Sequence, residues 1–187
     1  LRGQSPSLRI WLWNNGPPLP MAIAKRVDWL IESSRNLLCV PRWWIAARAT
    51  TPCVLILDDD LLPASPAAVA NLMAHVQAGH CVGPIGAILG KRYRDHVTVY
   101  SDTESRAVDV VKGRCLAVST ETLRASIGES DVLLARCGEE YDDLAVAEDI
   151  AICGSIACGR RGQHLVPRGL RDDWQNLNEG LESLSLR

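Results

Sequence analysis

The sequence lacks several features that would assign it to a specialised class of protein. No apolar run reaches the length of a membrane span, and no charged segment followed by an apolar one opens the chain. The net charge is only −2, which argues against a dedicated nucleic-acid-binding protein that works by bulk electrostatic attraction. Phenylalanine is absent, and three lysines stand beside seventeen arginines, a bias that indicates genomic base composition more than function.

The seven cysteines form no Cys-x-x-Cys pair. Most of them lie in apolar segments, such as those around Cys53 and Cys115. Scattered thiols in such surroundings are typical of buried, unpaired cysteines in a reducing compartment. We therefore expect a cytoplasmic protein.

The rest of the composition is that of an ordinary globular protein. Hydrophobic residues make up 47% of the 187 residues, and charged residues make up 22%. This length suits one domain with a substantial core, and a second independent domain would be cramped. We therefore interpret residues 1–187 as a single domain.

Apolar segments alternate with segments of helical periodicity along the chain. Strands are expected at 8–13, 36–40, 53–57, 81–89, 96–100, 107–119 (two strands around a turn at Lys112–Gly113) and 163–167. Helices are expected at 20–34, 42–50, 64–79, 120–127 and 144–158, followed by a polar, partly helical tail. This alternation predicts an α/β fold with a mixed, mostly parallel sheet flanked by helices, and ligands bind beyond the carboxyl ends of such strands.

An acidic turn, "VLILDDDLL" (54–62), follows the most apolar expected strand. Because side chains alternate along an extended chain, Asp58 and Asp60 are expected on one side and Asp59 on the other. Two carboxylates at the mouth of a sheet can share Mn²⁺ or Mg²⁺, hard cations that prefer oxygen ligands and substrate phosphates. The alternative is a solvated loop whose acids cap the next element. We favour the cation site, because the carboxylates follow a buried strand directly.

A second acidic pair, Glu148–Asp149, lies near the start of the last expected helix. Acidic residues in a first turn also suit the helix macrodipole, which is the structural alternative. Of the adjacent Trp43 and Trp44, one is expected in the core, and stacking on a base or sugar ring is the other use of such a residue. His164 is interpreted as a strand histidine rather than a metal ligand.

The order of these motifs resembles a known family. A strand that ends in "WNN" (13–15), a helix that contains Arg42, the segment "VLILDDDLLPAS" (54–65) and the later "AEDIA" (147–151) follow one another as in nucleotide-sugar glycosyltransferases. The resemblance is closest to the exostosin-like N-acetylhexosaminyltransferases, with the family 2 glycosyltransferases behind them. It implies a GT-A fold, a Rossmann-like arrangement, over residues 1–187.

The resemblance also implies a role for each matching acid. Asp58 would contact the ribose or donor sugar and share the cation, and Asp59 would lie in the same donor pocket. Asp60 would ligate the Mn²⁺ or Mg²⁺ that bridges the diphosphate, stabilising the leaving group as a Lewis acid. Asp149, with Glu148, would face the reacting carbon. In an inverting enzyme Asp149 would be the general base on the acceptor hydroxyl, and in a retaining enzyme it would stabilise the same face.

The resemblance also implies contacts to the nucleotide and a wall for the acceptor site. Asn14 and Asn15 would line its pocket, and Arg42 would lie near the uridine diphosphate, with arginines of 159–171 as further candidates. The strand pair at 111–119 would form the acceptor wall, with Gly113 allowing close approach of the backbone.

This chain departs from the family at both ends. The first βα unit is missing here or the donor pocket is built differently, and the tail has only Arg187 in place of an aromatic-His-Arg segment.

Together with the resemblance, these observations predict a metal-dependent glycosyltransferase that uses a nucleotide-sugar donor, with a UDP-sugar expected. The acceptor is left open among a glycan, a protein, a lipid and a modified DNA base. Two alternatives remain: a Mg²⁺-dependent nucleotidyltransferase or phosphotransferase, and a non-catalytic domain that binds a sugar nucleotide. The former usually needs a Gly-rich phosphate loop or a nearby lysine, and the sequence has no Gly-x-x-x-x-Gly-Lys.

Overall fold

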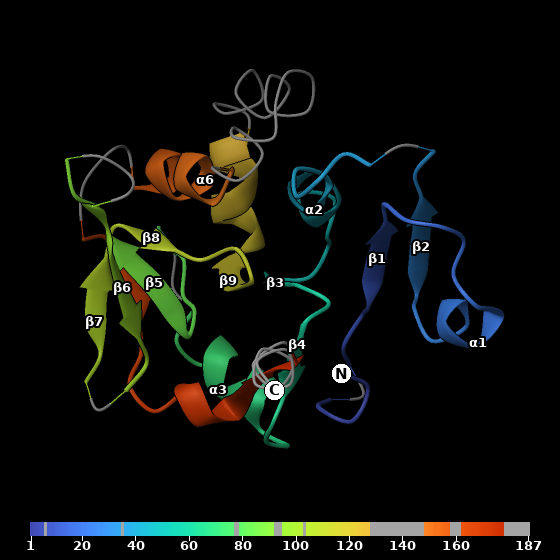
Figure 1. Ribbon diagram of the computed structural model, residues 1–187, viewed down its shortest axis with the longest axis horizontal. Helices are drawn as coiled ribbons and strands as arrows, with labels where there is room; N and C mark the ends of the chain where they lie inside the picture. The colour runs from blue at the N-terminus through green and yellow to red at the C-terminus, as the bar shows by residue number, and fades with distance from the viewer. Residues whose placement is uncertain are drawn as a thin grey trace, which may run out of the picture.

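The computed structural model describes residues 1–5, 7–34, 36–76, 79–91, 95–102, 104–127, 148–157 and 162–177 (Figure 1). Its strands are β1 (Trp11–Asn14), β2 (Trp29–Glu32), β3 (Cys53–Leu57), β4 (Leu61–Pro63), β5 (Ile85–Ile88), β6 (Val97–Tyr100), β7 (Arg106–Val108), β8 (Val110–Val111), β9 (Cys115–Ser119), β10 (His164–Val166) and β11 (Trp174–Asn176). Its helices are α1 (Met21–Ala24), α2 (Pro41–Ala46), α3 (Ala68–Met73), a run at 120–127, α6 (Glu148–Ile156) and the 3₁₀ turn η2 (Arg171–Asp173).

The strands form small sheets. β6, β5 and β8 make an antiparallel three-stranded sheet, and β3–β9, β10–β7 and β11–β4 are antiparallel pairs. Isolated bridges from Val82 to Ala117 and Leu165 connect β9 to β10. The parallel pair β1–β2 lies at one side of the molecule, and α2 contacts both β1 and β3 (Figure 1).

The pair β3–β9 lies between two hydrophobic clusters. Val54 and Ile56 of β3 belong to one buried cluster, whereas Leu55 and Leu57 pack against the other. Alternate residues of an extended strand point to opposite faces, so a strand that is covered on both faces must be apolar throughout. This explains the continuous apolar run before the acidic turn, and it places that turn at the end of a well-packed strand.

The expected α/β fold, with a mostly parallel sheet flanked by helices, is wrong. Among the strand pairs of the described residues, only β1–β2 runs parallel, and the helices are few and short. A short connection favours antiparallel pairing of neighbours such as β5 and β6, and the pairs β3–β9, β10–β7 and β11–β4, whose strands are distant in the chain, are antiparallel as well. The Rossmann-like GT-A sheet implied by the resemblance is therefore not observed, and the fold is of a mixed class.

Several individual elements also differ from expectation. The helix expected at 20–34 is only α1, and residues 29–32 form β2 instead. The strand expected at 36–40 is a turn, and part of the expected helical tail is β11. The strand at 53–57 and the helix at 120–127 are confirmed. No helix in the described ranges is long and apolar enough to cross a membrane.

Candidate functional site

The acidic turn is held against α2 by an ion pair. Asp58 immediately follows β3, and its backbone N–H donates to Arg114 O at 2.9 Å. Arg42, from α2, donates from Nη1 to Asp58 Oδ1 at 2.6 Å and to Gly113 O at 2.8 Å. The exposed side-chain fractions are 18% for Arg42 and 29% for Asp58, so the pair is largely shielded but reachable by solvent. These contacts bring three chain segments together at one point.

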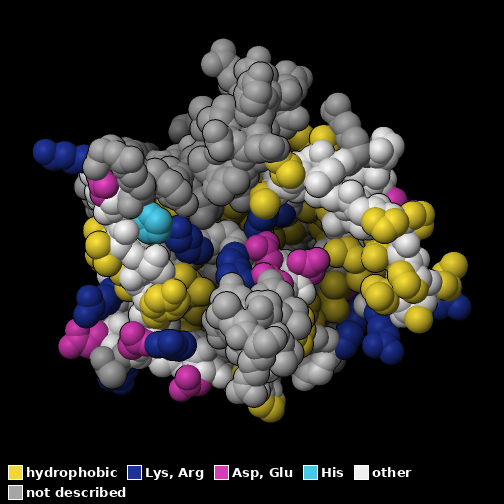
Figure 2. All heavy atoms as spheres, viewed as in Figure 1, with side chains coloured by type: hydrophobic (Ala, Val, Ile, Leu, Met, Phe, Trp, Pro, Cys, Tyr) yellow, Lys and Arg dark blue, Asp and Glu magenta, His cyan; other side chains and the backbone are white. Residues whose placement is uncertain are grey.

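A second arginine pairs with the third aspartate of the turn. Arg114 lies in the tight turn before β9 and donates from Nη2 to Asp60 Oδ2 at 2.6 Å. Asp59, between the two paired acids, is exposed. Asp58 and Asp60 are thus each paired with an arginine, whereas Asp59 has an exposed side chain. Figure 2 shows acidic and basic side chains side by side near the centre of the face it draws.

The far side of the turn is fixed by the end of the described chain. β4 follows the turn and pairs with β11 in the register Leu61↔Asn176. Leu177 N–H then donates to Asp60 O at 2.8 Å. The acidic turn is therefore bounded by β3 on one side and by the β4–β11 pair on the other, which fixes its backbone on rigid elements.

The three acids are not equivalent electrostatically. Burial raises the pKa of Asp58, the Arg42 guanidinium opposes that rise, and the neighbouring Asp60 carboxylate adds to it. A carboxyl group whose folded pKa is raised contributes stability below its unfolded pKa, and this contribution is lost as the pH rises through the folded value. Ionised Asp58 therefore costs folding stability near neutral pH. The arginine beside it offsets part of that cost.

The donor set at this turn fits a hard divalent cation. The carboxylates of Asp58 and Asp60 interact electrostatically, and each has one oxygen engaged by an arginine. Within the described residues no group of three or more Asp, Glu, His or Cys side chains surrounds a common point. The protein would supply one or two carboxylates and leave the other positions to water and phosphate oxygens, which is how Mg²⁺ is usually held.

The two asparagines assigned to the nucleotide pocket serve the local turn. Asn14 Oδ1 accepts from Gly16 N–H at 3.0 Å, and its Nδ2 donates to Pro17 O at 2.8 Å. Asn15 Oδ1 accepts from Trp13 Nε1 at 3.1 Å and from the N–H of Leu37, and its Nδ2 donates to Leu38 O. These bonds fix the loop after β1. The nucleotide contacts of both residues stay predictions.

The second acidic pair lies in a helix. Glu148 and Asp149 are the first described residues of α6, but their side chains lie outside the described part of the chain, as do residues 144–147. The helix itself packs over β8, where Cys153 Sγ lies 3.8 Å from Val111 O. Their role at a reacting centre therefore stays a prediction.

Arg114 is the site residue that the sequence analysis missed. It lies in a segment interpreted only as an acceptor wall, and its single signal was a basic residue next to a glycine in a tight turn. Of the arginines at 159–171 proposed for the diphosphate, Arg171 pairs instead with Asp102 at 2.9 Å and lies over the Tyr100 ring. Arg168 is exposed, and the others lie outside the described residues.

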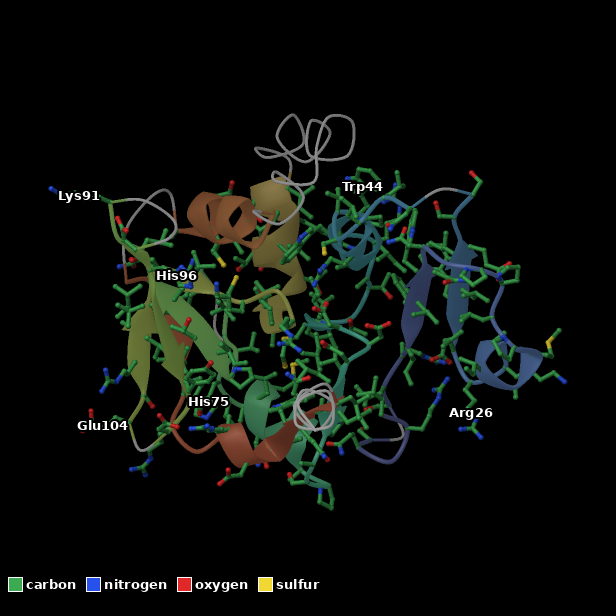
Figure 3. All side chains as sticks on the ribbon, viewed as in Figure 1. Arg26, Trp44, His75, Lys91, His96 and Glu104 are labelled. Atoms are coloured by element: carbon green, nitrogen blue, oxygen red, sulfur yellow. The ribbon has the colours of Figure 1, made fainter. Side chains whose placement is uncertain are left out.

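The histidines contribute no metal ligand at the acidic turn. His164 is buried, its Nδ1 accepts from Cys81 N–H at 2.9 Å, and its Nε2 lies 2.9 Å from Cys153 O. An acceptor Nδ1 requires the proton on Nε2, so this is a neutral core histidine with both nitrogens used. Figure 3 shows His75 and His96 on separate parts of the molecule, in agreement with their lack of ligand spacing.

Comparison with known proteins adds no assignment. Neither a scan of known protein families nor a search of curated proteins finds a match to this chain.

Proposed function

We propose that this chain is a metal-dependent glycosyltransferase that moves a sugar from a nucleotide diphosphate donor, a UDP-sugar, to an acceptor hydroxyl. The observation that carries the proposal is the pair of ion pairs at the acidic turn, Arg42–Asp58 and Arg114–Asp60. Carboxylates suit a divalent cation and guanidinium groups suit phosphate oxygens, so one turn offers both halves of a metal-diphosphate site.

The charge balance of the turn favours such a ligand. The turn carries three carboxylates and only two guanidinium groups pair with it, which leaves a net negative charge for a cation to neutralise. When a diphosphate approaches, Arg42 and Arg114 can turn their N–H groups from carboxylate to phosphate oxygens. Carboxylates and phosphates both accept paired hydrogen bonds from a planar guanidinium group. The carboxylates released in this way are then available to the cation. A ligand that brings a cation and a diphosphate together therefore suits the turn better than a cation alone or a diphosphate alone.

The residues divide the work of the reaction. Asp60 and Asp58 would hold the cation, which would supply Lewis-acid stabilisation of the departing diphosphate. Arg42 and Arg114 bind and orient the diphosphate through charge-assisted hydrogen bonds. Asp149, with Glu148, would face the reacting carbon, and in an inverting reaction Asp149 would take the acceptor proton. The acceptor is a hydroxyl on a glycan, a protein, a lipid or a modified DNA base.

Donor hydrolysis tests the proposal without knowledge of the acceptor. UDP release from UDP-N-acetylglucosamine is measured with Mn²⁺ and with EDTA, for the wild type, Asp60→Asn and the exposed control Asp172→Asn. We expect Mn²⁺-dependent release that falls at least about a hundredfold in Asp60→Asn, since lost charge stabilisation of a leaving group is worth several kcal/mol. The control should match the wild type.

The contrary outcomes are distinct. Metal-dependent binding of UDP without any hydrolysis or transfer would mean a non-catalytic domain that binds a sugar nucleotide. Release that is unaffected by both EDTA and Asp60→Asn would refute the assignment of the acidic turn. Far-UV circular dichroism of Asp60→Asn must match that of the wild type, so that loss of activity is not loss of the fold.

A further inference from the structure

An aromatic cavity lies on the other side of α2 from the acidic turn. It has a volume of about 580 Å³ and opens to solvent, and the indoles of Trp13, Trp29 and Trp44 line it. Aliphatic side chains from β2, α2 and the run at 120–127 complete the wall: Ile31, Ile45, Ala47 and Ile127. Cavities that bind small molecules typically have about 300–1,000 Å³ and a mostly apolar lining. The volume of this cavity falls within that range, and most of its lining residues are apolar.

The cavity is separate from the proposed sugar-transfer site. Successive residues of an α-helix are about 100° apart around its axis, so Trp44 lies nearly opposite Arg42 on α2. Arg42 reaches the acidic turn, whereas Trp44 and Arg48 line the cavity. Figure 3 labels Trp44 on α2. The cavity and the acidic turn therefore use different side chains.

The indole walls are oriented by contacts within the protein. Trp13 is fixed by its Nε1 hydrogen bond to Asn15 and packs edge-to-face on Trp44, with ring centroids 6.4 Å apart. Trp29 packs edge-to-face on Trp11, with centroids 4.8 Å apart. Such pairs hold rings in defined orientations, and walls fixed before binding reduce the entropy that a ligand must lose. Figure 2 shows hydrophobic side chains gathered over the β1, α1 and β2 part of the face.

The charge of the lining selects among ring-shaped ligands. Arg48 is the charged member of the lining, and among the described residues no carboxylate borders the cavity. Its Nη1 donates to Trp44 O at 2.8 Å, which anchors the guanidinium at the rim while the group remains exposed. An indole wall favours planar rings, and a fixed guanidinium favours an anionic substituent and repels cations.

We propose that this cavity binds a planar aromatic anion, a ring system that carries a carboxylate, sulfonate or phosphate group. The ring lies between the indoles of Trp29 and Trp44, and the anionic group pairs with Arg48. The site does not depend on the sugar-transfer proposal, because it uses none of the acidic-turn residues.

The test is isothermal titration of 2-naphthalenesulfonate, with neutral 2-naphthol as the matched probe. Arg48→Gln should weaken binding of the sulfonate about tenfold and leave that of the naphthol unchanged, since a charge-assisted hydrogen bond is lost. Arg48→Lys should restore part of that affinity. Trp29→Leu changes an exposed wall residue and should weaken both probes, and the exposed control Lys25→Gln should change neither.

Three outcomes would overturn the proposal. The first is no binding of the sulfonate to the wild type at probe concentrations up to about 1 mM. The second is equal affinity for the sulfonate and the naphthol, which would indicate a neutral ring ligand such as a sugar. The third is binding that neither Arg48→Gln nor Trp29→Leu changes, because the probe would then bind elsewhere.

Discussion

Arg42 Nη1 lies 2.6 Å from Asp58 Oδ1 and 2.8 Å from Gly113 O, so one guanidinium group joins α2, the end of β3 and the turn before β9. Its Nε also donates to Cys39 O at 3.0 Å. A planar fork with several donors is suited to such a junction, and a lysine would supply only a point charge. The junction gives the acidic turn a fixed geometry and places a guanidinium group beside it.

Replacement of Arg42 should destabilise the fold. Arg42→Gln leaves the partly buried Asp58 carboxylate without its counter-ion, and we expect a loss of about 1–3 kcal/mol in the free energy of unfolding. Urea unfolding followed by circular dichroism measures it. Arg9→Gln is the control, because Arg9 is 71% exposed and lies 3.6 Å from Asp28, and it should change stability by less than about 0.5 kcal/mol. If Arg42→Gln lowered the free energy of unfolding as little as Arg9→Gln does, the contacts of Arg42 would not stabilise the fold.

His164 should make stability depend on pH. Burial lowers the pKa of His164, although its bond to Cys153 O opposes the shift. The stability that neutral His164 contributes is present above the unfolded pKa of 6.5 and is lost as the pH falls through the lowered folded value. His164→Gln should therefore be clearly less stable than the wild type at pH 7.5, and the difference should shrink at acidic pH. A difference that is constant with pH would refute this assignment.

Two glycines should respond oppositely to the same substitution. A Cβ on Gly83 would lie 2.4 Å from both Cys115 O and Val111 Cγ1, so Gly83→Ala should destabilise the protein by about 1–3 kcal/mol. Gly154 lies within α6 with nothing within 4 Å of such a Cβ, so Gly154→Ala should stabilise by about 0.5–1 kcal/mol. Thermal unfolding of the two variants measures both. The same sign of change in both would contradict the packing at Gly83.

Asp173 should fasten the described end of the chain to α3. Its side chain is buried and accepts from Ser65 Oγ at 2.5 Å and from Asn71 Nδ2 at 2.9 Å. Asp173→Ala would leave both donors unsatisfied, and we expect a loss of about 1–3 kcal/mol in urea unfolding. Asp172→Asn, at an exposed neighbouring position, should have little effect. If Asp173→Ala were equally harmless, this network would not support the fold.

The position of a strand that is buried on both faces could be predicted from the sequence. The parallel or antiparallel direction of its neighbouring strand could not. The apolar run 53–57 is a buried strand as expected, because residues on both of its faces enter the core. Whether its neighbour runs parallel or antiparallel depends on the long-range contact with β9, which periodicity within one segment does not encode. The helix expected at 20–34 failed for a related reason, since Trp29–Glu32 pair with β1 and tertiary pairing overrides local propensity.

The candidate site was predicted in part. The acidic turn was singled out from the sequence, because an acidic triplet after a buried strand is unusual and costly. Arg42 was named only through the family resemblance, and its contact with Asp58 comes from the structure. Arg114 was missed, since its partner Asp60 lies 54 positions away and only the register of β3 and β9 brings the two together. The core role of His164 was anticipated from its strand setting, but its two backbone partners come from segments distant in the chain.

The most direct test of the central claim is isothermal titration of uridine diphosphate into the protein with Mn²⁺ and then with EDTA, on the wild type, Asp60→Asn and Arg114→Gln. The account predicts binding that requires Mn²⁺, is abolished by Asp60→Asn and is weakened about tenfold by Arg114→Gln through loss of a charge-assisted contact to phosphate. Asp172→Asn should bind as the wild type does. Absence of binding under every condition, or binding that ignores both EDTA and Asp60→Asn, would contradict the assignment of the acidic turn as a metal-diphosphate site.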